Sequence, residues 1–246
     1  MQLQSKVIAI TGGSQGLGKV LAKACCEQGA KVAIIGRNAQ KLEQAKSEID
    51  GDVAGFACDI SDPNSVRTTF AAIADQLGGL DVLINNAAVY PPFKMEKATD
   101  QQLRSVIDIN VLGAMYCCRE AIPLLKRSRG DIINVSSEAV RFNPPMLSVY
   151  AASKAALETF SQSLRVELAS SGVRVATLRV GHMHRNDASA LDEETMAEML
   201  KAFEETGFMV STGEGMEELT VAATLLHMLS LPADANIDLL ELRSRH

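Results

Sequence analysis

Residues 7–18 read VIAITGGSQGLG, an apolar run that passes directly into a glycine-rich turn. Gly12, Gly16 and Gly18 allow the backbone to turn sharply there and to approach a phosphate group closely. Residues 17–28 have the apolar spacing of a helix, and the N-terminus of a helix is a good phosphate site. The stretch therefore predicts a strand, a phosphate-binding turn and a helix.

The glycine spacing admits two other interpretations. It is Gly-x-x-x-Gly-x-Gly from Gly12, which differs from the GxGxxG dinucleotide fingerprint. Counted from Gly13 it approaches the P-loop of nucleoside triphosphatases, with Lys19 in place, but Val20 stands where that motif needs a hydroxyl to hold magnesium. A turn that binds no ligand is the second alternative, although several glycines in one turn weaken a fold unless a ligand uses the space.

Short β-branched runs alternate with longer segments of helical period along most of the chain. We predict strands over residues 7–10, 32–35, 53–57, 82–85, 132–135 and 173–180, and helices over 17–28, 39–49, 65–77, 99–125 and 148–169. This alternation implies a parallel sheet with right-handed crossovers. The predicted fold is α/β, a single-domain doubly wound parallel sheet (Rossmann fold) of about seven strands with helices on both faces. Ligands then bind at the carboxyl ends of the strands.

The last third of the chain departs from the alternation. Residues 181–211 hold few strand signals, four methionines and one amphipathic helix over 195–203. We predict that this segment lies over the sheet as a substrate lid. A helix over 216–230 and a short strand over 237–242 return the chain to the sheet edge, so residues 1–246 are expected to form one domain.

Composition and charge exclude several classes of protein. The 246 residues carry 30 acidic and 24 basic side chains, and the net charge of -6 argues against a nucleic-acid partner. No apolar stretch is long enough for a membrane span. The chain enters its first strand without a secretory signal, and its five cysteines include two adjacent pairs, which suits core thiols in the cytoplasm better than disulfides. No metal is expected, because His182 and His184 have no evident third ligand.

The end of the second predicted strand indicates which nicotinamide cofactor is used. NAD-dependent enzymes commonly place an acidic residue there to bind the adenosine ribose, whereas this chain reads Gly36-Arg37-Asn38. The planar cation of Arg37 suits a 2′-phosphate, which favours NADP(H) and leaves NAD(H) possible. The alternative is that Arg37 is only a solvated charge at the start of a helix.

The candidate catalytic residues follow the fifth predicted strand. Ser137 lies just after that strand, and Tyr150 and Lys154 stand at positions i and i+4 of the next helix, on one helical face. A free phenol ionises near pH 10, but a nearby cation favours the phenolate, so we expect Lys154 to lower the pKa of Tyr150. Tyr150 would then be a usable general acid/base.

Taken together, these motifs resemble the short-chain dehydrogenase/reductase family over almost the whole chain. TGGSQGLG is similar to its TGxxxGxG loop, Asn85-Asn86-Ala87 to its NNAG segment, and Asn110, Ser137, Tyr150 and Lys154 to its catalytic set in order and spacing. The resemblance implies that Tyr150 exchanges a proton with the substrate oxygen, which Ser137 also binds. It further implies that Lys154 binds the nicotinamide ribose and that Asn110 holds a water linking Lys154 to solvent.

The resemblance also implies a set of cofactor contacts along the carboxyl edge of the sheet, including an acid near the adenine after the third strand. The expected cofactor-binding residues are Gly12, Ser14, Gln15, Gly16, Leu17, Gly18, Arg37, Asn38, Asp59, Ile60, Asn86, Ala87, Tyr150, Lys154 and Gly181.

Several residues depart from the family pattern. Ala88 replaces the glycine of NNAG, Val180 replaces the proline that usually precedes Gly181, and Arg185 replaces a threonine beside the nicotinamide. The contacts on the nicotinamide side are therefore open. A protein that binds NADP as a sensor or scaffold without turnover is the alternative function, and the intact catalytic set argues against it.

The substrate is expected to be a small carbonyl or alcohol. The segments after strands four and five are mostly apolar, which suits a hydrophobic substrate, but methionine at helical spacing also fills cores. Arg179, His182, His184 and Arg185 could instead meet an anionic substrate. The helices over 99–125 and 148–169 are rich in small and apolar residues, and the family pairs the equivalent helices, so we expect a homodimer or homotetramer.

Overall fold

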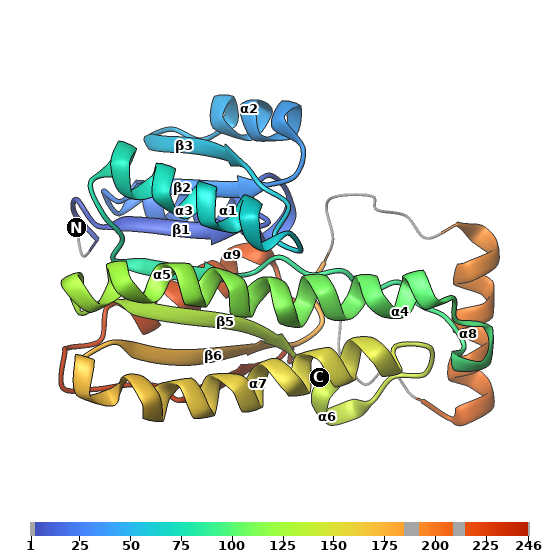
Figure 1. Cartoon of the computed structure of the whole chain (residues 1–246). Helices are drawn as coiled ribbons and strands as arrows, with labels where there is room; N and C mark the ends of the chain where they lie inside the picture. Colours follow the sequence, from blue (N-terminus) through green and yellow to red (C-terminus); the bar gives the residue numbers. More distant parts are fainter. Residues whose placement is uncertain (1–2, 185–191, 209–214, 246) are drawn as a thin grey trace.

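Seven parallel strands form one sheet in the part of the chain that the computed structural model describes, which is residues 3–184, 192–208 and 215–245 (Figure 1). The strands are β1 (Val7–Thr11), β2 (Lys31–Gly36), β3 (Asp52–Ala57), β4 (Val82–Asn85), β5 (Asp131–Ser137), β6 (Arg174–Val180) and β7 (Leu239–Leu242). Their order is β3-β2-β1-β4-β5-β6-β7, so the sheet grows outward in both directions from β1 and β4. This order confirms the doubly wound fold, whose ligand crevice opens where the winding reverses.

Helices cover both faces of the sheet (Figure 1). One face carries α1 (Gly16–Glu27), α2 (Ala39–Glu48) and α9 (Glu218–Leu229), and the other carries α3 (Pro63–Leu77), α5 (Ala114–Ser128) and α7 (Ser148–Leu168). Successive strand residues point to opposite faces, so in β1 Ile8 and Ile10 join the first core and Val7 and Ala9 join the second. Burial on both faces explains why the strands read as continuous apolar runs.

The helix predicted over 99–125 is interrupted. A capping box at Thr99 starts α4 (Asp100–Ile107), one π-helical segment follows at η2 (Asp108–Gly113), and α5 continues to Ser128. A Cβ on Gly113 would lie 2.9 Å from the Ile60 side chain, so a glycine is needed for this close approach. Single π turns are typical of functional sites, and this one contains Asn110.

Four further elements complete the described part of the chain. They are η1 (Met95–Lys97), α6 (Ala139–Phe142), η3 (Ala169–Ser171) and α8 (Glu193–Thr206), and the predictions included only the helix now seen as α8. The predicted lid over 181–211 lies partly outside the described residues. The predicted final strand is present at the sheet edge as β7, which pairs with β6.

The five cysteines are all free and buried, on both sides of the sheet. Cys25 and Cys26 lie on α1 in the core of one face, and Cys58, Cys117 and Cys118 lie in the core of the other. They act as small core residues, as expected. Among the described residues, no helix is long and apolar enough to cross a membrane.

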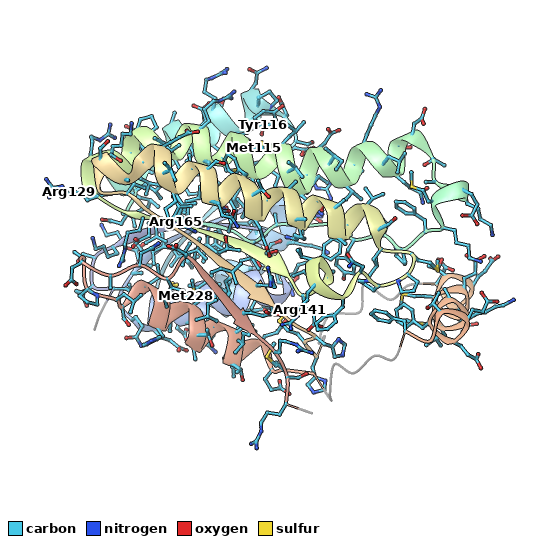
Figure 2. The ribbon with its side chains drawn as sticks, turned by 90° about the horizontal axis from the view of Figure 1, so that it is seen from below. Met115, Tyr116, Arg129, Arg141, Arg165 and Met228 are labelled. Carbon is cyan, nitrogen blue, oxygen red and sulfur yellow. The ribbon has the colours of Figure 1, made fainter. Side chains whose placement is uncertain are left out.

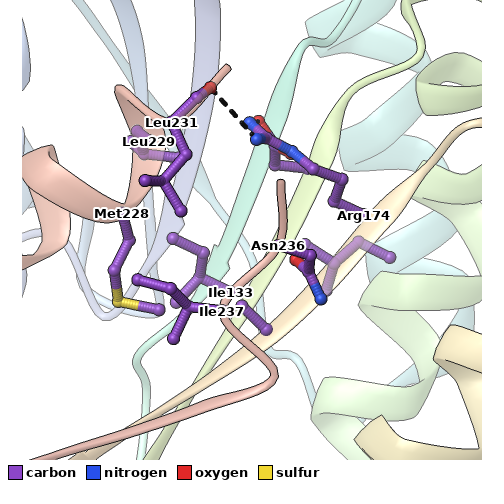
Figure 3. A pocket seen from close by; sticks show the side chains of 10 residues that line it. Ile133, Arg174, Met228, Leu229, Leu231, Asn236 and Ile237 are labelled. Carbon is purple, nitrogen blue, oxygen red and sulfur yellow. Dashed lines mark hydrogen bonds and ion pairs between the residues drawn. The ribbon is translucent and has the colours of Figure 1, made fainter. Parts of the chain in front are cut away.

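A small pocket lies at the amino ends of β5 and β6, away from the expected site (Figure 3). Its volume is about 10 Å³, enough for one water molecule. Arg174 closes it by donating to the main-chain carbonyls of Leu231 and Ala235, at 3.2 and 3.1 Å, while it pairs with Asp131. These bonds of Arg174 therefore hold the loop after α9 against the amino ends of β5 and β6.

Candidate active site

The glycine turn and the end of β4 form one hydrogen-bonded unit. The hydroxyl of Thr11 accepts from the backbone N–H groups of Asn86 and Ala87, each at 3.0 Å, and the Asn86 side chain donates to the Thr11 carbonyl at 3.0 Å. Gly12 has a φ of +68°, and a Cβ there would lie 3.0 Å from the Ala87 Cα. A Cβ on Gly18 would collide with the Gly12 carbonyl. Glycine is thus required where the turn meets Asn86 and Ala87.

The turn fits a phosphate group. Gln15 is the N-cap of α1 and Gly16 is its first residue, and no side chain caps the N–H groups of that first turn. Uncapped N–H groups at the positive end of a helix are a favourable site for an anion. Leu17 packs against the core, and Ser14 lies over Gly36, where an added Cβ would be 3.4 Å from the Ser14 hydroxyl. Ser14 thus contacts the end of β2 on one side of the turn, and Leu17 anchors the other side of the turn in the core.

The predicted adenosine side lies at the end of β2. Arg37 is exposed, and Asn38 accepts from the Lys41 N–H at 3.0 Å and so caps α2. The ammonium of Lys41 donates to the Gln15 side chain at 2.8 Å, which brings a second cation from α2 to the glycine turn. Sequence reasoning missed Lys41. Its position in the first turn of a helix that starts beside the phosphate site was the available signal.

Asp59 and Ile60 follow β3 and lie next to the crevice. One carboxylate oxygen of Asp59 accepts from the N–H and the hydroxyl of Ser61, at 3.0 and 2.7 Å. Ile60 is buried against Gly113 of the π-helical segment. The pair thus joins the end of β3 to η2, at the place predicted for the adenine.

Ser137, Tyr150 and Lys154 come together between β5 and α7. The Ser137 and Tyr150 hydroxyls are hydrogen-bonded, and the Lys154 ammonium lies 5.9 Å from the centre of the Tyr150 ring. Lys154 is only 3 % exposed, and its ammonium donates to the Val135 carbonyl at 2.7 Å. The structure therefore places the three predicted side chains at one point.

Burial controls both titratable groups of this cluster. It raises the pKa of Tyr150 above its usual value, while the hydrogen bond from Ser137 opposes this rise. It also lowers the pKa of Lys154 to about 8. Removal of the phenol from water is the main cause of the upward direction of the pKa of Tyr150. The expected effect of Lys154 on this pKa stays a prediction.

Asn110 fastens the segment after β4 to α7. Its side-chain oxygen accepts from the Val89 N–H at 2.8 Å, and its side-chain nitrogen donates to the Val89 carbonyl at 2.8 Å and to the Ser153 hydroxyl at 3.0 Å. Ser153 lies between Tyr150 and Lys154 on α7. The Asn110 side chain is therefore occupied by the protein itself, and its predicted link to Lys154 through a water stays a prediction.

Arg179 cannot meet an anionic substrate, because two acidic residues hold it. Glu158 of α7 accepts from its guanidinium at 2.9 and 2.6 Å, and Glu241 of β7 accepts at 3.3 Å. Glu158 also accepts from Ser136 at 2.6 Å, and Arg141 of α6 pairs with Glu241. These five residues form a network, here called the edge network, which joins β5, β6 and β7 to two helices.

The end of β6 is fixed by backbone bonds. Gly181 donates to the Leu242 carbonyl at 2.8 Å, and a Cβ there would lie 2.9 Å from Glu138. Met216 donates to the His182 carbonyl and accepts from the His184 N–H, each at 2.9 Å. No group of three metal-ligating side chains occurs among the described residues, and Arg185 lies outside them.

Comparisons with known proteins agree with this geometry. The profile described as short chain dehydrogenase matches residues 6–196. Carbonyl reductase family member 4 of Xenopus laevis is 31% identical over 229 residues, 93% of this chain and 92% of that protein.

Two solved structures share the fold. The alcohol dehydrogenase of the archaeon Thermococcus sibiricus, complexed with 5-hydroxy-NADP, superposes with a TM-score of 0.83 at 23% identity and covers 97% of this chain and 96% of its own. The 3-ketoacyl-(acyl-carrier-protein) reductase of Brucella melitensis, complexed with NADH, has a TM-score of 0.84 at 24% identity, with 98% and 97% covered.

Proposed function

The chain belongs to the short-chain dehydrogenase/reductase family, and from this we propose that it is an NADP(H)-dependent enzyme that interconverts a carbonyl and an alcohol with Tyr150 as general acid/base. Membership of the family makes it an oxidoreductase that acts on CH-OH or carbonyl groups with NAD(P). The assignment of Tyr150 as the general acid/base is supported most by its hydrogen bond with the Ser137 hydroxyl and by the Lys154 ammonium, which lies 5.9 Å from the centre of the Tyr150 ring.

The proposed mechanism gives the proton transfer to the chain and the hydride to the cofactor. A nicotinamide cofactor, when bound, supplies or accepts the hydride. Tyr150 donates its phenolic proton to the carbonyl oxygen during reduction and takes it back from the hydroxyl during oxidation. Ser137, whose hydroxyl already bonds that of Tyr150, holds the same substrate oxygen. Lys154 is assigned to the nicotinamide ribose, next to the Tyr150 ring.

The proposed preference for NADP(H) is supported by two cations beside the glycine turn. Arg37 follows β2 directly with no acidic side chain before it, and Lys41 reaches Gln15 at 2.8 Å. Both can form charge-assisted hydrogen bonds to a 2′-phosphate, which NAD lacks. The 5-hydroxy-NADP and NADH of the two solved structures belong to those proteins, and both cofactor types are compatible with the fold.

The remaining proposals concern the lid, the assembly and the compartment. We propose that residues 181–211 form the substrate lid, and the described part of this segment gives one observation in support: Glu198 of α8 pairs with Lys97 of η1 at 3.0 Å.

We propose a homodimer or homotetramer through α5 and α7, which lie side by side on one outer face (Figure 2). The five free cysteines support a cytoplasmic location.

The test follows NADPH absorbance in the presence of a panel of aldehydes and ketones. We expect turnover by the native protein, and we expect Tyr150→Phe to lower it by roughly 10²–10⁴-fold while NADPH affinity stays within a few fold. Tyr116→Phe, which makes the same change on α5, is the matched control and should keep full activity. Cofactor binding without turnover of any carbonyl would favour the sensor alternative.

A further inference from the structure

The short helix α6 starts two residues after Ser137, and its first backbone N–H group bonds the Ser137 side chain. The Ala139 N–H donates to the Ser137 hydroxyl oxygen at 3.2 Å. A serine hydroxyl has one hydrogen to donate and two sites that accept. The bond from Ala139 uses one accepting site and leaves the hydrogen for Tyr150 or for a substrate oxygen. The position of α6 therefore contributes to the orientation of the Ser137 hydroxyl.

Arg243, which follows β7, contacts both ends of α6. Its Nε lies 3.5 Å from the carboxylate of Glu138, the residue before α6, and its Cζ lies 4.5 Å from the ring centre of Phe142, the last residue of α6. Ion pairing and the stacking of a cation on an aromatic ring are both attractive. Arg141 of α6 also pairs with Glu241, but its side chain is 57% exposed, against 27% for Arg243. Arg243 is therefore the more shielded support of α6.

The contact of Arg243 with Glu138 lies over the end of β6. The Glu138 N–H donates to the Val180 carbonyl at 2.9 Å. The Gly181 N–H donates to the Leu242 carbonyl at 2.8 Å. A Cβ on Gly181 would lie 2.9 Å from the Glu138 carboxylate and 3.2 Å from the Arg243 Cα, so the ion pair needs a glycine at this place. The carboxyl ends of β5, β6 and β7 are thus joined at the start of α6.

We propose that Arg243 is a positioning residue for carbonyl reduction, which acts through α6: it fixes this helix and so keeps the Ala139 N–H directed at the Ser137 hydroxyl. The proposal rests on the proposed function in so far as Ser137 binds the substrate oxygen. Without the cation, α6 loses a contact at each end, and the bond from Ala139 to Ser137 opens more often. The Ser137 hydroxyl is then less well placed in the transition state, whereas the cofactor contacts of the glycine turn are unchanged.

The first test is amide hydrogen exchange with saturating NADPH, which needs no turnover. Peptides over residues 137–143 should exchange faster in Arg243→Met, which removes the cation and keeps an apolar side chain. Arg165→Met is the matched control, because Arg165 pairs with Asp238 just before β7 and donates to the Val175 carbonyl near the amino end of β6. The same peptides should exchange in Arg165→Met as in the native protein. Unchanged exchange in Arg243→Met would overturn the proposal.

The second test measures carbonyl reduction in the native protein and in Ser137→Ala. Arg243→Met should lower kcat of the native protein roughly tenfold, a part of the roughly hundredfold that a misplaced active-site group can cost, and leave the KM for NADPH unchanged. In Ser137→Ala the same change should lower kcat no further, because the hydroxyl through which Arg243 acts is absent. Arg243→Lys keeps the cation and should retain more activity than Arg243→Met. An equal fold loss in both backgrounds would show a structural role only and overturn the proposal.

Glu138→Gln replaces Arg243→Met in both tests if the latter does not fold, because it removes the charge at the other end of the ion pair. The same outcomes are then expected. A failure of the proposed function is detected separately, since it is the absence of NADPH oxidation by the native protein and involves no variant.

Discussion

At the scale of single residues, burial shifts Tyr150 and Lys154 in opposite directions and favours the neutral form of both. The pKa of Tyr150 is raised, and that of Lys154 is lowered to about 8. The spacing of the two residues correctly predicted that they meet, but it could not reveal how deeply the two groups are buried. The reason is that sequence spacing reveals neighbours and not the loss of water around them.

Lys154→Met should stabilise the protein while it removes activity. Each pKa unit corresponds to about 1.4 kcal/mol, so holding Lys154 charged in the core below pH 8 costs about 3 kcal/mol against an exposed lysine. Part of this gain is offset by the lost hydrogen bond to Val135. We expect a higher melting temperature at pH 7 and a difference from the native protein that shrinks toward pH 10, where the native lysine is neutral. A melting temperature that falls at pH 7 would contradict this account.

Arg37→Ala should remove most of the preference for NADP(H). A charge-assisted hydrogen bond contributes about 1.5–3 kcal/mol, so NADP affinity should fall roughly tenfold to a hundredfold, and NAD affinity should barely change. Lys41→Ala should act in the same direction with a smaller effect, because Lys41 already bonds Gln15. Isothermal titration calorimetry with NADP and with NAD measures the two affinities. Lys23→Ala is the control, because Lys23 is an exposed lysine on α1. Unchanged NADP affinity in Arg37→Ala would make Arg37 a solvated charge only.

At the scale of elements, the sequence predicted the strands and the long helices well but not the short ones. All seven predicted strands are present, and β1 and β2 are the ones with the longest buried apolar runs. The π-helical segment η2 and the four-residue α6 were missed, since η2 depends on the contact of Gly113 with Ile60, which is distant in sequence. Asn110 was identified by resemblance alone, and its clamp on Val89 follows from that segment.

The edge network also could not be predicted, because its members are brought together by strand register. Ser136, Arg179 and Glu241 occupy adjacent positions of β5, β6 and β7, with Glu158 above them. The carboxylate of Glu158 raises the pKa of Arg179, which keeps the pair charged. Arg179 was one of four basic residues that could have met an anionic substrate, whereas the fold uses it for structure.

Arg179→Leu should destabilise the fold strongly. Removal of one member of a buried pair leaves Glu158 as an uncompensated charge, and the expected loss in the free energy of unfolding is about 3 kcal/mol. The double variant Glu158→Leu with Arg179→Leu should recover most of this loss, because a well-packed apolar pair replaces a buried ion pair at little cost. Urea unfolding of the three proteins gives the comparison. A single variant as stable as the native protein would show that the pair is solvated.

At the scale of the whole molecule, the outer face of α7 is where we propose the contact with a second copy of the chain. Ala152, Thr159 and Val166 are exposed and spaced by seven residues, so they lie on one stripe, and Val166 is 78% exposed. α5 lies beside α7 on this face, where Figure 2 shows Met115 and Tyr116. Small side chains along such a stripe allow two helices to approach closely.

Val166→Glu should therefore reduce the molar mass in solution. Light scattering of the native protein should give a multiple of 26.4 kDa, and the variant should approach the single-chain value, because a second charge beside Glu167 would be buried in the contact. Leu219→Glu is the control: Leu219 is 69% exposed on α9, which covers the opposite face of the sheet. A native mass of one chain, or no change in Val166→Glu, would argue against the α7 contact.

The buried cysteines can report how the core of the protein opens, because all five are free thiols. Burial raises the pKa of Cys25 and Cys118 to about 12, raises that of Cys26 to about 11, and also raises the pKa of Cys117. An alkylating reagent can therefore react with these thiols only when the surrounding core opens. Cys25 and Cys26 lie on one side of the sheet, and Cys58, Cys117 and Cys118 on the other. Mass spectrometry of a slow labelling reaction would therefore count two opening events separately, and it would show whether the two halves of the core come apart together or in turn.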